Sequence, residues 1–133
     1  MSTIPQELNW VEKRAACTAE TLFSQLVFGI SEDIKARNAA GADAQFAAGL
    51  TSDRRALIVG ESGTWARKER VRIFPLKGKI EVRDEVTNTS FSAEVFLNNE
   101  GRCKLRLEDK TELEQWQFRR MALERLFFCE AAS

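Results

Sequence analysis

Apolar residues recur at helical spacing in the first third of the chain. They fall on one side of a helix between residues 19 and 38, at Leu22, Phe23, Leu26, Val27, Ile30 and Ile34. Thr18, a short hydroxyl side chain directly before this pattern, is a typical N-cap. Phe28 points away from the apolar side. We therefore predict a helix over about residues 19–38 that covers a core and leaves one phenylalanine outside it.

A second helical pattern, over about residues 112–129, has apolar residues on two sides. Thr111 and Glu114 have the spacing of a capping box, which marks a helix start. One stripe contains Leu113, Trp116, Leu123 and Phe127, and the other contains Phe118, Ala122, Leu126 and Cys129. A surface helix needs only one apolar face. Two interpretations remain open: both sides are buried within the monomer, or one side meets a second subunit, a ligand or the other helix.

Between these helices the pattern changes to a period of two, which indicates β-strands. Short strands are predicted near residues 46–50 and 56–60, and alternating ones around 70–73 and 80–83. The clearest hairpin spans residues 91–107, with the turn sequence Asn-Asn-Glu-Gly in its middle. Apolar and charged residues alternate along these strands. This alternation is typical of an antiparallel sheet with one covered face.

Residues 9–17 fit a short strand, which we prefer, although a helix also fits. The strand gives the element order β-α-β(n)-α and an α+β fold: a mostly antiparallel sheet of about five to seven strands, covered on one face by the two helices. This order resembles that of helix-grip proteins of the lipid-transfer and polyketide-cyclase kind. In such proteins a curved sheet wraps a long C-terminal helix around a cavity. The resemblance rests on element order alone.

Length and charge narrow the class of protein. The 133 residues fit a single domain, residues 1–133, in which residues 1–8 form a loose tail. Twenty basic and twenty acidic residues cancel, so no overall field attracts nucleic acid or anionic lipid. No apolar run approaches the ~18 residues that span a bilayer, and the N-terminus lacks the pattern of a signal peptide. We expect a cytoplasmic protein without a membrane partner.

The residue types argue against catalysis. The chain contains no histidine and no tyrosine, which excludes a Ser-His-Asp triad, a Cys-His pair and histidine metal sites. Cys17, Cys103 and Cys129 are odd in number and widely spaced, so we predict reduced, buried thiols and no zinc site. We expect no catalytic residue, no metal and no cofactor. Whether the protein is an enzyme stays open, and the residue types favour a protein that is not one.

The C-terminal helix carries the main candidate binding residues, Trp116, Arg120 and Leu123, and Trp65 and Phe91 are further candidates. Arg120 lies among apolar neighbours, and a buried guanidinium requires a carboxylate partner or a bound anion. The sequence thus predicts an apolar, anion-accepting cavity or groove between sheet and helices, which binds a small apolar or amphiphilic anionic ligand. The alternative is a structural ion pair, or a guanidinium that reaches solvent.

Two other functions remain open. A homodimer or other protein–protein contact could use the C-terminal helix, with Phe28, Phe118 and Leu126 in the interface. A weak nucleic-acid contact could use the basic residues within 67–83, near Trp65 and Phe74. We do not expect nucleic acid as the main partner, because acidic residues share that predicted face and the net charge is zero.

Overall fold

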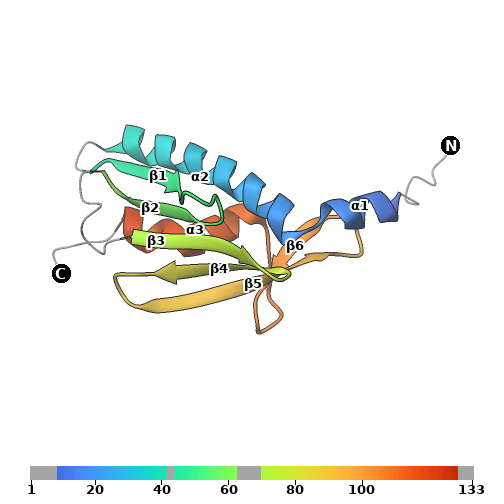
Figure 1. Cartoon of the computed structure of the whole chain (residues 1–133). Helices are drawn as coiled ribbons and strands as arrows, with labels where there is room; N and C mark the ends of the chain where they lie inside the picture. The colour runs from blue at the N-terminus through green and yellow to red at the C-terminus, as the bar shows by residue number, and fades with distance from the viewer. Residues whose placement is uncertain (1–8, 42–43, 63–69, 129–133) are drawn as a thin grey trace.

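The computed structural model describes residues 9–41, 44–62 and 70–128. In this part of the chain two helices come first, seven strands follow and a third helix ends the fold (Figure 1). The elements are α1 (Trp10–Ala16), α2 (Ala19–Ala40), β1 (Phe46–Leu50), β2 (Leu57–Glu61), β3 (Arg70–Leu76), β4 (Lys79–Asp84), β5 (Thr89–Leu97), β6 (Cys103–Arg106), β7 (Glu112–Leu113) and α3 (Gln115–Phe127). The predicted α+β class is confirmed.

The strands form one antiparallel sheet in which each strand pairs with its neighbour in sequence, in the order β1 to β7. Each described turn between consecutive strands has one residue with a left-handed backbone conformation (positive φ). These residues are Arg54, Gly78, Asn88, Gly101 and Lys110. Glycine adopts that conformation without the steric cost that a side chain brings. The seven strands agree with the upper end of the predicted range.

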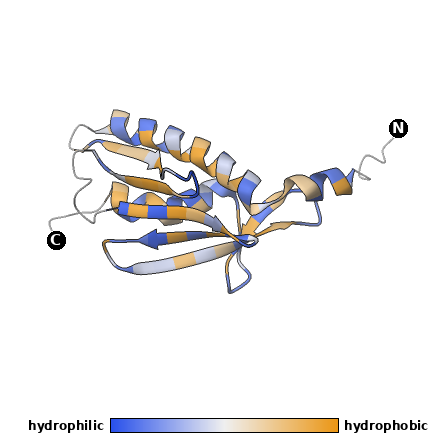
Figure 2. Cartoon of the chain, viewed as in Figure 1, coloured by the Kyte–Doolittle hydropathy of each residue, from blue (hydrophilic) through white to orange (hydrophobic). Residues whose placement is uncertain are grey.

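One face of the sheet is covered by α2 and α3, and no helix among the described residues covers the other, which we call the uncovered face (Figure 1). The strands alternate hydrophobic and hydrophilic residues along much of their length (Figure 2). The buried sheet residues include Leu57, Val59, Val71, Ile73, Ile80, Val82, Ala93, Leu105 and Leu113. They pack against the apolar sides of both helices in a single core. Burying one such aliphatic side chain contributes about 1.5–3 kcal/mol, so the covered face supplies most of the stability.

The two long helices lie side by side and run in the same direction. Gln115 Nε2 at the start of α3 donates to Gln25 Oε1 over 2.7 Å, and Arg37 near the end of α2 donates through Nε to the Phe127 carbonyl over 2.9 Å. Thr18 caps α2 as predicted, since its hydroxyl oxygen accepts from the Thr21 N–H over 3.1 Å. Helix α2 ends two residues later than predicted, at Ala40.

The predicted strand over residues 9–17 is wrong: Trp10–Ala16 is a helix, so the order begins with two helices. The Asn9 side chain caps it by accepting from the Glu12 N–H over 3.1 Å. No residue of α1 is buried. In Figure 1 the helix projects from the body of the molecule. The pattern of residues 9–17 therefore reflects no sheet pairing, and the Asn9 cap favours the helix.

The predicted start of the last helix is also wrong. Leu113 pairs with Leu105 in the sheet, and the Thr111 carbonyl accepts from the Leu107 N–H over 2.9 Å, so both residues belong to the β6–β7 hairpin. Glu114 is the N-cap, and its N–H donates to Gln117 Oε1 over 2.8 Å.

A lysine of β6 also holds this helix start. Lys104 Nζ lies 2.6 Å from a Glu114 carboxylate oxygen. This hydrogen bond lowers the pKa of Glu114, which keeps the N-cap ionised. A negative charge at the N-terminus of a helix is favourable, because the backbone dipoles place partial positive charge there.

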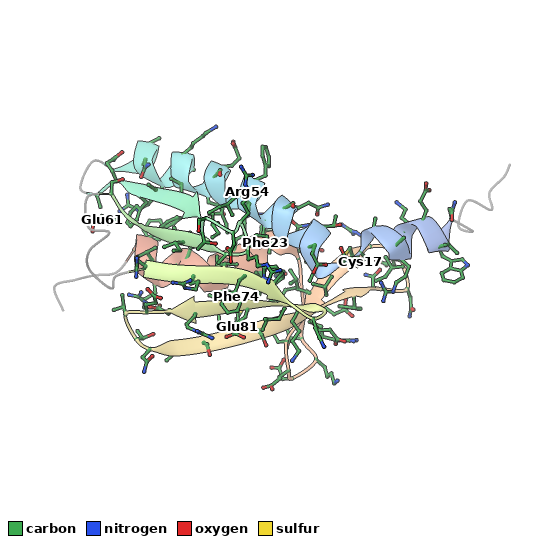
Figure 3. The ribbon with its side chains drawn as sticks, in the orientation of Figure 1. Cys17, Phe23, Arg54, Glu61, Phe74 and Glu81 are labelled. Carbon is green, nitrogen blue, oxygen red and sulfur yellow. A yellow bond between two sulfur atoms is a disulfide. The ribbon has the colours of Figure 1, made fainter. Side chains whose placement is uncertain are left out.

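The prediction of reduced thiols is wrong for two of the three cysteines. Cys17 and Cys103 form a disulfide with their Cα atoms 5.4 Å apart, which ties the α1–α2 junction to β6 (Figure 3). Cys129 lies outside the described residues. Disulfides persist mainly in oxidising compartments. The cytoplasmic expectation thereby loses the support that free thiols would have given it. No helix of the described residues is long and apolar enough to cross a membrane.

We predict that the Cys17→Ala/Cys103→Ala double variant loses stability, because the cross-link joins residues 86 positions apart and restricts the unfolded chain. The expected decrease in the free energy of unfolding is about 4 kcal/mol for a loop of this length. Urea unfolding of both proteins with and without reductant measures it. The reduced wild type should match the variant. A decrease below about 1 kcal/mol in both would contradict the prediction.

Candidate ligand-binding groove

Trp116, Arg120 and Leu123, the three main predicted binding residues, line one groove on the outer side of the helix pair. The groove has a volume of about 320 Å³. Its other lining residues are Asp33 of α2, Arg119, Glu124 and Phe127 of α3, and Phe128 directly after α3. The groove lies on the solvent side of the helices. The predicted residues therefore line a groove outside the helices and not a cavity between sheet and helices. Apolar side chains of a single core fill the space between those two layers.

Helical periodicity brings the lining residues together. Positions 116, 120, 123 and 127 lie on one side of α3 over successive turns. Leu123 and Phe127 are buried and form the floor, whereas Trp116 is 53% exposed and forms a wall. Phe128, 60% exposed, lies where the helix ends. An apolar floor with exposed aromatic walls is suited to hold an apolar group.

Arg120 is not the buried guanidinium that its neighbours suggested. Its side chain is 64% exposed, and its Nε lies 3.2 Å from an oxygen of Glu124, one turn later on the same helix. An ion pair does exist, but the partner comes from α3 itself rather than from the sheet. Such exposed pairs contribute about 0–1 kcal/mol. Arg120 therefore stands at the rim of the groove with its charge accessible to solvent.

The neighbouring Arg119 is the charged residue that lies between the helices. Its Nε donates to Asp33 Oδ2 over 2.7 Å, and both side chains are partly buried. The Arg119 guanidinium passes directly over Gly29, where a Cβ would lie 2.6 Å from Nη1. The sequence offered one signal for this contact: a glycine in the middle of a strong helical pattern usually has a packing reason.

Arg37 fixes the far end of α3 and was missed by the sequence analysis. It is buried, and its guanidinium carbon lies 5.2 Å from the ring centroid of Phe46 and 5.1 Å from that of Phe128. Its hydrogen bond to the Phe127 carbonyl satisfies a backbone group that a helix C-terminus leaves open. Residue 37 follows Ile30 and Ile34 on the apolar side of α2, and that position was the available signal.

The other predicted site residues lie elsewhere. Phe91 is on β5 at the opposite side of α3, where its ring packs 5.5 Å from that of Phe118. Phe118 and Leu126, predicted in an interface, are buried in the core, while Phe28 is 69% exposed on α2. Trp65 lies outside the described residues. The two apolar stripes of α3 are thus the two edges of one wide buried face, from which Trp116 extends into solvent.

The uncovered face of the sheet carries the basic residues, apart from 67–69, which lie outside the described residues. Glu85 pairs with Arg70 at 3.1 Å and with Arg72 at 3.5 Å. Glu81 pairs with Arg83 at 2.9 Å. These carboxylates neutralise part of the positive charge of this face, as the sequence had indicated.

A hollow of about 380 Å³ on this face contains three arginines and an aromatic ring. Its arginines are Arg55, Arg72 and Arg83, and Phe74 lies among them. The Arg83 guanidinium carbon is 5.3 Å from the Phe74 ring centroid. Figure 3 shows Phe74 and Glu81 on neighbouring strands β3 and β4. Asp53 at the rim has a lowered pKa because the Thr51 hydroxyl donates to it, so one negative charge faces the arginines.

No protein family, no curated protein and no solved structure matches the chain. Within the described ranges, no three or more Cys, Asp or Glu side chains gather closely enough to hold a metal ion. The geometry of the groove and of the sheet faces is therefore the basis for a functional proposal.

We predict that the contact between Gly29 and Arg119 is energetically coupled. Alanine in a helix interior is favoured over glycine by about 1 kcal/mol, but a Cβ at position 29 displaces Arg119 from Asp33. Gly29→Ala should therefore raise the free energy of unfolding of an Arg119→Ala protein by about 0.5–1 kcal/mol. In the wild type the same substitution should have an effect at least ~0.5 kcal/mol less favourable. Thermal unfolding of the four proteins measures the coupling.

The matched control is Arg120→Ala, which removes the neighbouring arginine of the same helix. Arg120 pairs with Glu124 and not with α2, so its effect should add to that of Gly29→Ala. Additive effects for Arg119→Ala as well would show that the close approach of the guanidinium to Gly29 has no energetic consequence.

Proposed function

We propose that the protein is a non-enzymatic binding module whose groove between α2 and α3 holds an apolar molecule with an anionic end. The observation that carries the proposal is the shared groove of Trp116, Leu123, Phe127 and Phe128, with Arg120 at its rim. The volume of about 320 Å³ is at the lower end of the ~300–1,000 Å³ typical of small-molecule sites. A single aliphatic chain is a ligand of suitable size.

The apolar part of the ligand would cover the exposed aromatic surface. Trp116 and Phe128 together expose apolar area that the fold does not use. Covering such area contributes roughly 25 cal/mol per Å². The buried Leu123 and Phe127 give the groove an apolar floor, and the charged lining residues are already paired, Arg119 with Asp33 and Arg120 with Glu124.

The anionic part follows from the difference between the two arginines. Arg119 is partly buried and held by Asp33 between the helices, so it stays with its partner. Arg120 is exposed, and its pairing with Glu124 is worth little in water. A guanidinium has five N–H donors, so Arg120 can bind a ligand carboxylate while it keeps or exchanges Glu124.

The prediction is tested with decanoate, decanol and decyltrimethylammonium, three probes with one chain length and different head groups. Trp10→Phe and Trp65→Phe leave Trp116 as the single fluorescent tryptophan. Below its micelle-forming concentration, decanoate should shift the Trp116 emission saturably and bind up to about fivefold more tightly than decanol, because an ion pair with an exposed guanidinium contributes at most ~1 kcal/mol. Arg120→Gln should remove this difference.

Arg83→Gln is the matched control, because Arg83 is an exposed, ion-paired arginine of β4 that lies on the sheet face away from the helices and does not line the groove. Phe128→Ala should weaken all three probes, because it removes a wall. The proposal fails if no probe gives a saturable change, or if decyltrimethylammonium binds as tightly as decanoate.

A second copy of the chain is the competing occupant of this surface. Large exposed aromatic side chains such as Trp116 and Phe128 are typical of protein interfaces, and Phe28 on α2 is a further one, outside the lining of the groove. Sedimentation of the samples used in the titration separates the two cases. A dimer at ~100 μM that dissociates as the emission of Trp116 changes would assign the groove to a second copy, whereas a monomer throughout leaves it to the small molecule.

The uncovered sheet face supports a second candidate function, the weak binding of single-stranded nucleic acid. The specific observation is the hollow in which Arg55, Arg72 and Arg83 surround Phe74. Single-strand binding combines cations for phosphates with aromatic rings on which bases stack. The pairing of Arg72 and Arg83 with Glu85 and Glu81 weakens the field, so we propose low affinity.

A labelled oligouridine measures this second candidate by fluorescence anisotropy. Binding should appear at low salt and weaken steadily as salt is added, because released counterions drive it. Phe74→Leu should lower affinity about fivefold through lost stacking, equivalent to ~1 kcal/mol. Arg120→Gln on the helical side is the matched control and should change nothing. The absence of binding at low salt, or binding that salt leaves unchanged, excludes this function.

A further inference from the structure

Strand β5 is longer than the strand that follows it, so part of its edge has no neighbour among the described residues. β5 pairs with β4 over Thr89–Glu94, but β6 accompanies it only over Glu94–Leu97. After Arg106 the chain turns away: the Lys110 N–H donates to the Leu107 carbonyl over 2.8 Å, and Lys110 has a φ of 75°. Residues 89–93 of β5 are therefore an open sheet edge.

The hydrogen-bond pattern shows which backbone groups this edge offers. The Val95 N–H donates to the Gly78 carbonyl over 2.8 Å, so Val95 directs its backbone groups toward β4. In an antiparallel ladder this direction alternates along the strand. Glu94 directs its groups toward β6, and Ser92 and Ser90 direct theirs the same way, beyond the point where β6 ends. Two N–H groups and two carbonyls thus face the open side.

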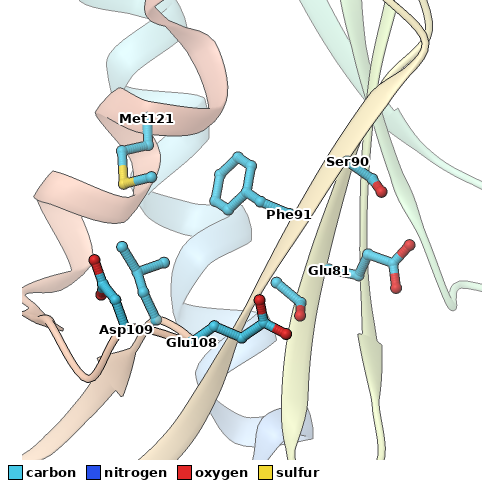
Figure 4. A pocket seen from close by; sticks show the side chains of 8 residues that line it. Glu81, Ser90, Phe91, Glu108, Asp109 and Met121 are labelled. Carbon is cyan, nitrogen blue, oxygen red and sulfur yellow. The ribbon is translucent and has the colours of Figure 1, made fainter.

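A hollow of about 490 Å³ lies directly along this edge (Figure 4). Phe91, Leu107 and Met121 give it an apolar side, and in Figure 4 the Phe91 ring points toward Met121 of α3. Glu81, Glu108 and Asp109 give it an acidic rim. Edge backbone groups, an apolar recess and a charged rim therefore occur together along this part of β5.

We propose that an extended segment of a partner protein, alternating apolar and basic residues, adds to the open edge of β5 as a further strand. Adding a strand to an exposed edge is a general mode of peptide recognition, in which the backbone gives affinity and alternate side chains give specificity. The proposal is independent of the groove between α2 and α3, which lies on a different side of α3.

Each side of the added strand meets a matching surface. Side chains of successive residues point to opposite faces. One set enters the recess between Phe91, Leu107 and Met121, which accepts aliphatic groups. The other set lies on the face of Ser90 and Ser92, next to Glu81 on β4.

The charges of the rim favour basic residues in that second set. Glu81 is already paired with Arg83. Among the described residues, Glu108 and Asp109 form no ion pair. Asp109 accepts from the Thr111 N–H over 3.0 Å, and the hydrogen bonds from Thr111 lower its pKa, so it is ionised at neutral pH. Both carboxylates can therefore pair with a lysine or arginine of the partner without giving up an ion pair to another described residue.

The test uses a fluorescein-labelled heptapeptide of alternating lysine and aliphatic residues, with the full chain as receptor and anisotropy as the measurement. Two further peptides carry N-methyl groups, either on all lysines or on all aliphatic residues. Only one of these sets directs its N–H groups at β5, so one methylated peptide should lose at least tenfold in affinity and the other should bind like the parent. Loss by the lysine set indicates an antiparallel strand, and loss by the aliphatic set a parallel one.

A substitution in the protein gives the complementary evidence. Ser92→Pro removes an N–H that points away from β4, and proline is tolerated on edge strands. It should reduce binding at least tenfold, while Ser92→Ala should keep it within twofold. The N-methyl comparison needs no variant, so it stands if Ser92→Pro does not fold. Undetectable binding of the parent peptide at 1 mM, or equal binding of both methylated peptides, overturns the proposal.

Discussion

The covering of one sheet face by two parallel helices is the constraint on which the rest of the structure depends. It fixes the inner side chain at each strand position, because residues that alternate along β2, β3 and β4 must all reach the same apolar layer. It also creates the groove, which lies on the side of the helices away from the sheet, where Asp33 of α2 and Arg119 of α3 form an ion pair. The second sheet face, which no described helix covers, is left to charged residues by the same arrangement.

Where the burial pattern is strong, the sequence predicts the structure. The spacing from Leu22 to Ile34 predicted α2, and the alternation after Arg70 predicted the antiparallel sheet. The errors fall where burial decides nothing. Helix α1 has no buried residue, so its pattern carried no information about its structure. The start of α3 was misplaced because Thr111 can serve a helix cap or a hairpin equally well, and the pairing of Leu113 with Leu105 decided between them.

For the candidate groove, too, the sequence predicted some features correctly and not others. Trp116, Arg120 and Leu123 could be grouped from helical spacing alone, and they do line one groove. Their contacts across the fold could not be predicted. The partner of Arg119 is 86 residues away, and the Cys17–Cys103 disulfide joins residues equally distant. Spacing along a helix is a local property, whereas both of these contacts require the packing of separate elements. Arg120 differs because its partner is one turn away, within reach of a local argument.

The meander order of the strands has a consequence for the chain as it is synthesised. Every strand pairs with the one made just before or after it, so the sheet needs no distant segment to assemble. Helix α3 is the exception: the core positions of Phe118, Leu123 and Phe127 are filled only after β1 to β7 have all been made. Until then, the apolar sheet surface beneath α3 faces water. A nascent chain that has completed β6 therefore exposes the apolar face of its sheet to solvent until α3 has been synthesised. In this interval the chain is most prone to aggregation.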